Sequence, residues 1–393
     1  MNKKGISTTT AALAVVIIVV VVAAAAYIAV SPGKNNTVTQ TVTNTATTTY
    51  YSLTLQAGGS TFVNPLMQDW AIAFEQYTNN AVSTNYQALG SGAGITGILK
   101  GTFEFAGSDA PVPASQSALN TTVHGQLLQI PETLGGVAIF YNVPGVAVSL
   151  NLTGPIIAKI YLGTITRWND SAIAALNPGC HAGSTTCVLP GNTIVPVHRV
   201  DGSGTTYALT NYFEKVSTDW NASFTTGCPC YGTSVSWPSF ELGGHGSAGV
   251  AADVLNNPYT IGYADSYYAF NNKLQAAAIQ NQAGVFLAPS LTNIAAAASA
   301  FSTQVQVNPT FTITNAPGAG SYPIATFTYL LVWQKQTNQQ QGYDTAHFFW
   351  WIVSQGQQYG PNLYYPTLPS SVVSIDQSLI KQIEYNGVPF IQS

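Results

Sequence analysis

The chain has 393 residues, of which 46% are hydrophobic and 11% aromatic, so it can bury cores for two domains. Charged residues make up only 7% of it, against roughly 25% in typical soluble proteins, and its only two arginines are Arg167 and Arg199. The net charge of −4 argues against a nucleic-acid partner, and so few charges suit an acidic exterior in which carboxylates protonate.

Residues 11–30 form an unbroken run of twenty apolar residues, long enough to cross ~30 Å of hydrocarbon as a helix. Lys3 and Lys4 precede this run, and only the lone Lys34 follows it closely. The positive-inside rule therefore predicts a cytoplasmic segment at 1–10, a transmembrane anchor at 11–30 and an extracellular remainder at the cell membrane. A cleaved secretory signal is the alternative. The first residues also resemble a pilin-like signal cut after Gly5, which would leave the anchor attached.

Residues 31–50 are rich in Thr, Val and Asn and show no apolar periodicity, so we expect an extended stalk rather than a core. Asn-x-Ser/Thr sequons along the chain predict a glycosylated, exported surface. They begin at Asn35, Asn120, Asn151, Asn169 and Asn221.

The chain has four cysteines, Cys180, Cys187, Cys228 and Cys230. An oxidising exterior favours disulfides, and the sequence leaves all three possible pairings open. Zinc is the alternative, but the nearby His181 adjoins a cysteine instead of standing at ligand spacing. We therefore predict structural cysteines, no metal site and no cofactor.

From residue 51 onward, segments in which apolar and polar residues alternate, as in strands, are followed by segments in which apolar residues recur at helical spacing. Alternation at 53–55 precedes a helical pattern over 62–77, and alternation at 82–88 precedes another around 95–99. Residues 259–270 read as strand and loop, and 291–301 as a helix. Alternating units of this kind predict an α/β fold with largely parallel sheets.

Three short loops share one design, in which a strand is followed by Gly, Ser and Thr and then by a helix start. They lie at residues 58–62, 90–94 and 201–206. Glycine lets the backbone approach a ligand, and the first N–H groups of a helix lack partners, so each loop suits an anion. A single such loop is more often an ordinary helix cap; three in one chain favour an anion site.

Two charged residues sharpen this prediction. Arg199 stands two residues before Asp201 at the third loop, and its planar fork suits bidentate contact with an oxyanion. Asp201 can orient Arg199, although the pair could be purely structural. Asp109 follows another strand-like segment, where a turn or capping role is the plainer interpretation.

These loops belong to a longer set of motifs that resembles the substrate-binding protein of phosphate-specific ABC transporters over about residues 53–375. The motifs are Gly59-Ser60-Thr61-Phe62, Tyr86-Gln87-Ala88-Leu89-Gly90-Ser91-Gly92, Gly107-Ser108-Asp109-Ala110-Pro111, Ile160-Tyr161-Leu162-Gly163, Arg167-Trp168-Asn169-Asp170, Arg199-Val200-Asp201-Gly202-Ser203-Gly204-Thr205, Gly243-Gly244-His245-Gly246, Ile261-Gly262-Tyr263 and Tyr365-Pro366-Thr367-Leu368-Pro369. His245, where that family more often has Lys, and the Cys180–Cys187 loop depart from the pattern.

The resemblance implies a two-lobed α/β fold of the type II periplasmic-binding-protein kind, with phosphate enclosed between lobes. Lobe I would comprise residues 51–133 and 323–393, and lobe II residues 134–322. The hinge crossings would fall near 132–141 and 322–328. ABC permease and ATPase subunits would be the partners.

The resemblance also assigns ligands by position. The hydroxyl donors would be Thr61, Ser91, Ser203 and Thr205, and the backbone N–H donors would be Phe62 and Gly204. Arg199 would supply the charged fork, held by Asp201. Asp109 would accept the proton of a protonated phosphate. Sulfate carries no such proton near neutral pH, so Asp109 would disfavour it.

Three other functions remain as alternatives. An enzyme is disfavoured because the sequence shows no nucleophile–base or metal-binding motif, so we predict no catalytic residues. A structural cell-surface or pilus-like subunit would suit the N-terminus and stalk. A binder of another tetrahedral oxyanion, sulfate or arsenate, would share the anion loops.

Overall fold

The computed structural model describes residues 50–51, 53–224, 230–307 and 310–392, and Tyr50–Ser393 form one compact unit. The predicted cytoplasmic segment, anchor and stalk up to residue 49, with the sequon at Asn35, lie outside the described residues. Within the described part, no helix is both long and apolar enough to cross a membrane.

A mixed sheet of nine strands runs through the described part, accompanied by a three-stranded and a two-stranded sheet. Its order is β2-β1-β3-β12-β4-β8-β6-β7, with β9 also pairing with β4. The strands are β1 (Leu53–Gly59), β2 (Val82–Ala88), β3 (Phe105–Ser108), β4 (Leu127–Asn142), β5 (Asn151–Leu152), β6 (Val195–Arg199), β7 (Leu242–Gly244), β8 (Thr260–Asp265), β9 (Gln275–Ala276), β10 (Ala278–Gln280), β11 (Phe286–Leu287), β12 (Ala325–Trp333), β13 (Glu384–Tyr385) and β14 (Val388–Pro389).

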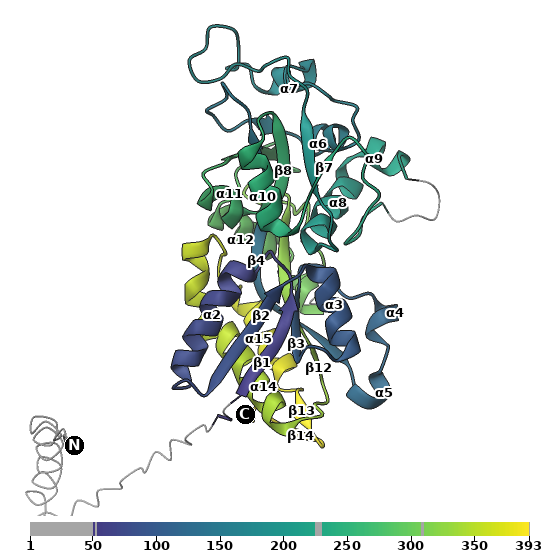
Figure 1. The fold of residues 1–393 in the computed structure, drawn as a ribbon, viewed down its shortest axis with the longest axis vertical. Coiled ribbons are helices and arrows are strands. Elements are labelled where there is room, and N and C mark those ends of the chain that lie inside the picture. Colours follow the sequence, from purple (N-terminus) through teal and green to yellow (C-terminus); the bar gives the residue numbers. More distant parts are fainter. Residues whose placement is uncertain (1–49, 52, 225–229, 308–309, 393) are drawn as a thin grey trace, which may run out of the picture. The chain divides into compact units, whose positions relative to one another are not determined.

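The long strand β4 connects two lobes (Figure 1). Its residues 127–136 pair with β12, and its residues 137–142 pair with β8. In the order of strands across the sheet, we call the part with β2, β1, β3 and β12 the first lobe and the part with β8, β6 and β7 the second lobe. The expected two-lobed α/β fold is thereby confirmed.

The expectation of largely parallel sheets is correct only at the two ends of the large sheet. There β1 pairs in parallel with β2 and β3, and β6 with β7 and β8. In the centre, β12 is antiparallel to β3 and β4, and β4 is antiparallel to β8. The expectation fails there because β4 and β12 are crossing strands and not members of strand–helix–strand units.

Helices cover both lobes, and their apolar faces form the cores. In α2, Leu66, Trp70 and Phe74 recur every four residues and are fully buried, as the helical pattern predicted. The helices are α2 (Asn64–Tyr77), α3 (Ser91–Lys100), α4 (Ala114–Ser117), α5 (Thr121–His124), α6 (Gly154–Tyr161), α7 (Ser171–Leu176), α8 (Gly204–Val216), α9 (Thr218–Ala222), α10 (Gly246–Asn256), α11 (Ser266–Asn271), α12 (Leu291–Ala300), α13 (Ser302–Val307), α14 (Gln339–Val353), the 3₁₀ helix η1 (Gln355–Leu363) and α15 (Ser370–Ile380).

The segment 259–270 differs from its prediction. Its first half forms strand β8 as expected, but the predicted loop is the helix α11. Tyr268 and Ala269 are buried within α11, so tertiary packing stabilises a helix that the weak helical propensity of its aromatic residues did not indicate.

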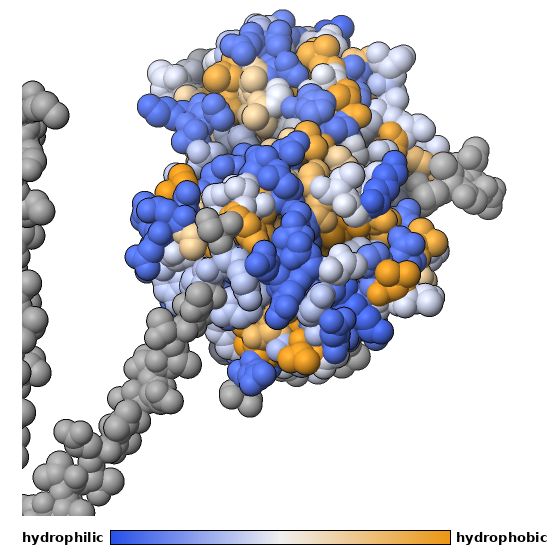
Figure 2. Space-filling model, turned by 60° about the horizontal axis from the view of Figure 1, so that its bottom comes forward, coloured by the Kyte–Doolittle hydropathy of each residue, from blue (hydrophilic) through white to orange (hydrophobic). Residues whose placement is uncertain are grey.

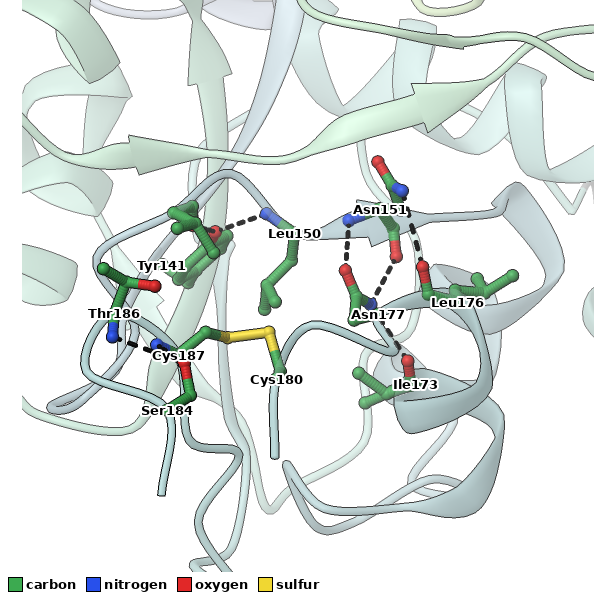
Figure 3. The surroundings of a disulfide bond; sticks show 11 residues. Tyr141, Leu150, Asn151, Ile173, Leu176, Asn177, Cys180, Ser184, Thr186 and Cys187 are labelled. Atoms are coloured by element: carbon green, nitrogen blue, oxygen red, sulfur yellow. Dashed lines mark hydrogen bonds between the residues drawn. A yellow bond between two sulfur atoms is a disulfide. The ribbon is translucent and has the colours of Figure 1, made fainter. Parts of the chain in front are cut away.

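One disulfide joins Cys180 to Cys187, which resolves the pairing for these two cysteines (Figure 3). Beside it, the amide of Asn177 bonds to the backbone of Asn151 and Ile173 and secures the end of α7. Cys230 is half-buried and has no disulfide to a described cysteine, whereas Cys228 lies outside the described residues. The described pair is structural, as predicted.

Uncharged polar residues provide much of the exposed surface. Figure 2 shows hydrophilic residues interspersed with small apolar patches on one face of the molecule. Of the two arginines, Arg167 is exposed and donates to the carbonyl of Gly191 at 2.6 Å, while Arg199 is only 4% exposed. A buried arginine needs compensating partners, and those of Arg199 are Asp201 and Ser247 of its own lobe.

Candidate anion-binding site

The three predicted loops each connect the end of a strand to the start of a helix, as expected. Thr61 and Phe62 lie between β1 and α2, Ser91 begins α3 after β2, and the third loop runs from β6 to α8. Ser203 caps α8, its Oγ accepting a hydrogen bond from the Thr206 N–H at 3.1 Å. The loops therefore place the N-terminal ends of α2, α3 and α8 beside the predicted ligand residues, and the dipole at such helix ends favours anions.

Arg199 ends strand β6 and is held in a fixed orientation. Its Nε donates to Asp201 Oδ1 at 2.8 Å, and its Nη2 donates to Asp201 Oδ2. Burial opposes charge on Asp201, but the hydrogen bonds and positive charge of Arg199 lower the pKa of this carboxyl. The Gly246 N–H also donates to Asp201 Oδ1, at 2.9 Å. Asp201 thus has the orienting contacts that the sequence suggested.

Asp109 follows β3 and is only 2% exposed. Ser60 Oγ donates to its Oδ1, Thr205 Oγ1 donates to its Oδ2 at 3.4 Å, and its own N–H donates to Ser91 Oγ at 3.2 Å. Burial raises the pKa of Asp109 to about 7, against the opposing effect of the Ser60 hydrogen bond and the charge of Arg199. An acid so placed can either accept or donate a proton near neutral pH.

The two lobes approach each other closely around these groups. The Gly92 N–H of the first lobe donates to the Gly202 carbonyl of the second at 2.8 Å. A Cβ added to Gly204 would lie 2.6 Å from both Asp109 Cβ and Ser91 Oγ. Glycine is required at position 204 for this approach, because any side chain would overlap with the opposite lobe.

The eight residues assigned by position therefore come together at one place, with Asp201 behind Arg199. Hydrogen bonds (some of them through Ser60 and Ser247), close approach and, for Ser203, adjacency to Gly204 in the chain connect them in a single buried cluster of Thr61, Phe62, Ser91, Asp109, Arg199, Ser203, Gly204 and Thr205.

Two further residues of this cluster were absent from the sequence-based ligand set. Ser60 joins Asp109 to the start of the first helix, its Oγ also accepting from the Phe62 N–H at 3.0 Å. Ser247, in the first turn of α10, lies between Thr61 and Arg199. A signal for Ser247 was present, because Gly243-Gly244-His245-Gly246 is a fourth glycine-rich segment between a strand and a helix.

Neither histidine near the cluster contributes to it. His198 Nδ1 lies 2.9 Å from Glu241 Oε2, and its ring stacks on Trp237, so this residue packs within the second lobe. His245 is exposed before α10. Among the described residues, no group of three or more His, Cys, Asp or Glu could hold a metal ion.

The composition of the cluster decides which ligands it can hold. It offers many hydroxyl and backbone N–H donors and one cation, but one fixed carboxylate as acceptor. Such a set suits a small oxyanion, and an oxyanion that itself carries a proton could also donate to Asp109.

Comparison with known proteins agrees with this geometry. The family model for the PBP superfamily domain matches residues 34–355. The phosphate-binding protein PstS of Xylella fastidiosa (strain Temecula1) is 37% identical over 334 residues, covering 85% of this chain and 84% of that one. The phosphate-binding protein PstS of Methanocaldococcus jannaschii is 32% identical over 352 residues, covering 85% of this chain and 87% of that one.

Solved structures share the fold at lower sequence identity. A human phosphate binding apolipoprotein superposes with a TM-score of 0.64 at 21% identity, covering 82% of this chain and 93% of that one. A phosphate-bound periplasmic phosphate-binding protein, PfluDING, gives 0.63 at 21% identity, covering 83% and 93%. From the family model and the relatives above 30% identity, this chain belongs to the PBP superfamily and, within it, to the PstS family of phosphate-binding proteins.

Proposed function

We propose that this protein binds inorganic phosphate outside the cytoplasm and delivers it to an ABC importer. The relatives that share its family are named phosphate-binding proteins. The observation that carries the proposal is the buried cluster itself, in which one arginine, one carboxyl and three helix N-termini meet between the lobes. Binding, rather than catalysis, is the whole of the proposed activity, and it requires no cofactor.

In the proposed complex, oxyanion oxygens accept hydrogen bonds from two groups of donors. The first lobe supplies Thr61, Phe62 and Ser91, and the second supplies Ser203, Gly204 and Thr205. Arg199 contributes the charged fork, oriented by Asp201. These roles follow from position in the family and are supported by the mutual proximity of the groups.

Asp109 is the proposed specificity determinant. Monohydrogen and dihydrogen phosphate both carry a proton that the Asp109 carboxylate can accept as a hydrogen bond. Sulfate would instead place a lone pair and a like charge against a buried carboxylate. The free energy of binding would then be weakened by several kcal/mol, roughly the cost of leaving a buried charged group unpaired.

For the domain organisation, we propose lobe I at residues 51–133 and 323–393 and lobe II at 134–322. The change of partner within β4, from β12 to β8 after residue 136, supports a hinge near 132–141. The strand β12 begins at Ala325 and supports the second crossing near 322–328. Thr328 Oγ1 donates to Glu132 Oε1 at 2.5 Å and links the two crossings.

For localisation, we propose a single-pass anchor at residues 11–30, with the globular part extracellular on a stalk ending near residue 50. ABC permease and ATPase subunits are the proposed partners. Of the predicted glycosylation sites in the described part, Asn120, Asn169 and Asn221 are exposed, while Asn151 is half-buried and bonds to the Leu176 carbonyl (Figure 3).

Calorimetric titration of the ligand-stripped full-length chain with phosphate and with sulfate tests this function. We expect tight one-to-one phosphate binding that sulfate does not compete for, and an Asp109→Asn variant in which the preference for phosphate over sulfate falls at least about 100-fold. Folded protein without phosphate binding would refute the proposal and favour a structural surface role. Equal binding of sulfate would indicate a general oxyanion binder.

A further inference from the structure

Ser247 is a fully buried hydroxyl whose partners come from both lobes. Its Oγ accepts a hydrogen bond from Arg199 Nη1 at 3.3 Å and lies 3.0 Å from Thr61 Oγ1. Its backbone N–H donates to Thr61 Oγ1 at 3.1 Å. The side chain does not cap its own helix, because the residue before α10 is His245 and no side-chain cap bond is made there.

The hydrogen count at Thr61 determines the direction of the bond to Ser247. Thr61 Oγ1 has one hydrogen and two lone pairs, and one lone pair already accepts from the Ser247 N–H. If Thr61 donated to Ser247, it could present only a lone pair to an oxyanion, which would repel it. If Ser247 donates to Thr61, the Thr61 hydrogen is free to face the anion.

Arg199 makes the second arrangement favourable. Because its Nη1 donates to Ser247 Oγ, the hydroxyl of Ser247 is polarised and becomes a better donor to Thr61. Of the five guanidinium hydrogens, two serve Asp201 and one serves Ser247. One hydrogen remains on each terminal nitrogen, the pair that can contact an oxyanion bidentately.

We propose that Ser247 is a positioning residue for anion binding, which relays the charge of Arg199 through its hydroxyl to Thr61 and joins the lobes when the site closes. The chain runs from Arg199 Nη1 to Ser247 Oγ, then to Thr61 Oγ1 and finally to the bound oxyanion. This inference rests on the proposed function, since it assigns Thr61 and Arg199 to phosphate.

A double-mutant cycle on the full-length chain tests the relay. Phosphate titrations would compare the wild type with Ser247→Ala, Thr61→Val and the double variant. We expect each single change to weaken binding about tenfold, the scale of one lost hydrogen bond to a charged ligand. We expect the double variant to bind within about twofold of Thr61→Val alone, because the relay acts only through Thr61.

Ser266→Ala is the matched control. Ser266 is also a buried serine in the first turn of a helix of the second lobe, and its Oγ donates to the Tyr364 carbonyl of the first lobe at 3.5 Å, outside the anion cluster. It therefore separates the relay from an ordinary hydrogen bond between the lobes. We expect its phosphate affinity to stay within about twofold of the wild type. Melting temperatures of the ligand-free variants verify folding, and Ser247→Gly replaces Ser247→Ala if the latter does not fold.

The outcomes separate the two proposals. Tight phosphate binding by the wild type with unchanged affinity in Ser247→Ala would overturn the relay alone, as would additive losses in the double variant. Absence of phosphate binding by the wild type would overturn the proposed function and the relay together. Non-additive losses confined to the Ser247 and Thr61 variants support the relay.

Discussion

Two buried charged residues of the cluster experience opposite environments. Arg199 has a carboxylate partner in Asp201, so its charge is compensated within its own lobe. The Asp109 carboxyl accepts hydrogen bonds from the hydroxyl groups of Ser60 and Thr205, and desolvation outweighs these bonds and the charge of Arg199, so its pKa is raised to about 7. In the proposed complex, a protonated phosphate would add a further donor to Asp109.

This imbalance predicts a pH-dependent stability for the ligand-free protein. The folded pKa of Asp109 exceeds its unfolded value, so the folded state binds more protons between pH ~4 and ~7 and loses stability as pH rises through that window. At pH 8, Asp109→Asn should be more stable than the wild type by at most about 4 kcal/mol. Near pH 4 this gain should vanish in denaturant titrations.

Asp201→Asn provides a control of opposite sign. The pKa of Asp201 is lowered in the folded protein, so its stabilisation is present above the unfolded pKa and is lost as pH falls through the folded value. At pH 8 this variant should be less stable than the wild type. A stability difference between Asp109→Asn and the wild type that is the same at pH 4 and pH 8 would contradict the assignment.

At the scale of elements, the site consists of one repeated unit, a strand that ends in a glycine-rich segment and a helix start. Four such units meet: β1 with α2, β2 with α3, β6 with α8, and β7 with α10. Glycine is decisive where units of opposite lobes touch. Gly204 faces Asp109 and Ser91, and Gly90, with φ of 92°, faces Asp201 and the Gly202 carbonyl.

Gly204→Ala should therefore weaken phosphate binding about 10- to 100-fold, because a Cβ 2.6 Å from Asp109 and Ser91 prevents the lobes from closing fully. Gly249→Ala is the control: it lies inside α10, and its Cβ would meet nothing closer than 3.5 Å. We expect calorimetry to give unchanged affinity for that variant. Equal affinities of the two variants would refute the steric explanation.

At the scale of the whole molecule, we expect closure of the lobes to carry an electrostatic cost that the proposed ligand offsets. Polar contacts join the lobes at the site, among them Gly92 with Gly202 and Thr205 with Asp109. Closing over an ionised, desolvated Asp109 is unfavourable, whereas a bound protonated anion pairs with it. The proposed hinge lies at the crossings through β4 and β12.

Phosphate should accordingly decrease the radius of gyration of the wild type at pH 8, measured by small-angle X-ray scattering. The decrease should be smaller in Gly204→Ala, even at phosphate concentrations that saturate the variant, because its lobes cannot reach the same separation. Sulfate at equal concentration should leave the wild-type value unchanged. An identical compaction in both proteins would argue against closure around Gly204.

The sequence by itself determined the repeated strand, loop and helix start from which the site is made, but not all of the residues that form the site. Glycine, serine and threonine between a strand and a helix are local signals, because helix termini and backbone freedom depend on neighbouring residues alone. These local signals are sufficient to indicate Ser91, Ser203 and Gly204. Arg199 is likewise visible as a rarity beside the third loop, because the chain has only one other arginine, and Asp201 stands two residues away as its companion.

Only the tertiary structure decided which groups touch. Thr61 and Ser247 are 186 positions apart, and Thr205 and Asp109 are 96 apart, so no local pattern reports their contact. The antiparallel centre of the sheet has the same cause, since β4 and β12 meet from distant parts of the chain. The pKa of Asp109 also depends on burial, which arises when both lobes cover it and the solvent that would stabilise its charge is excluded.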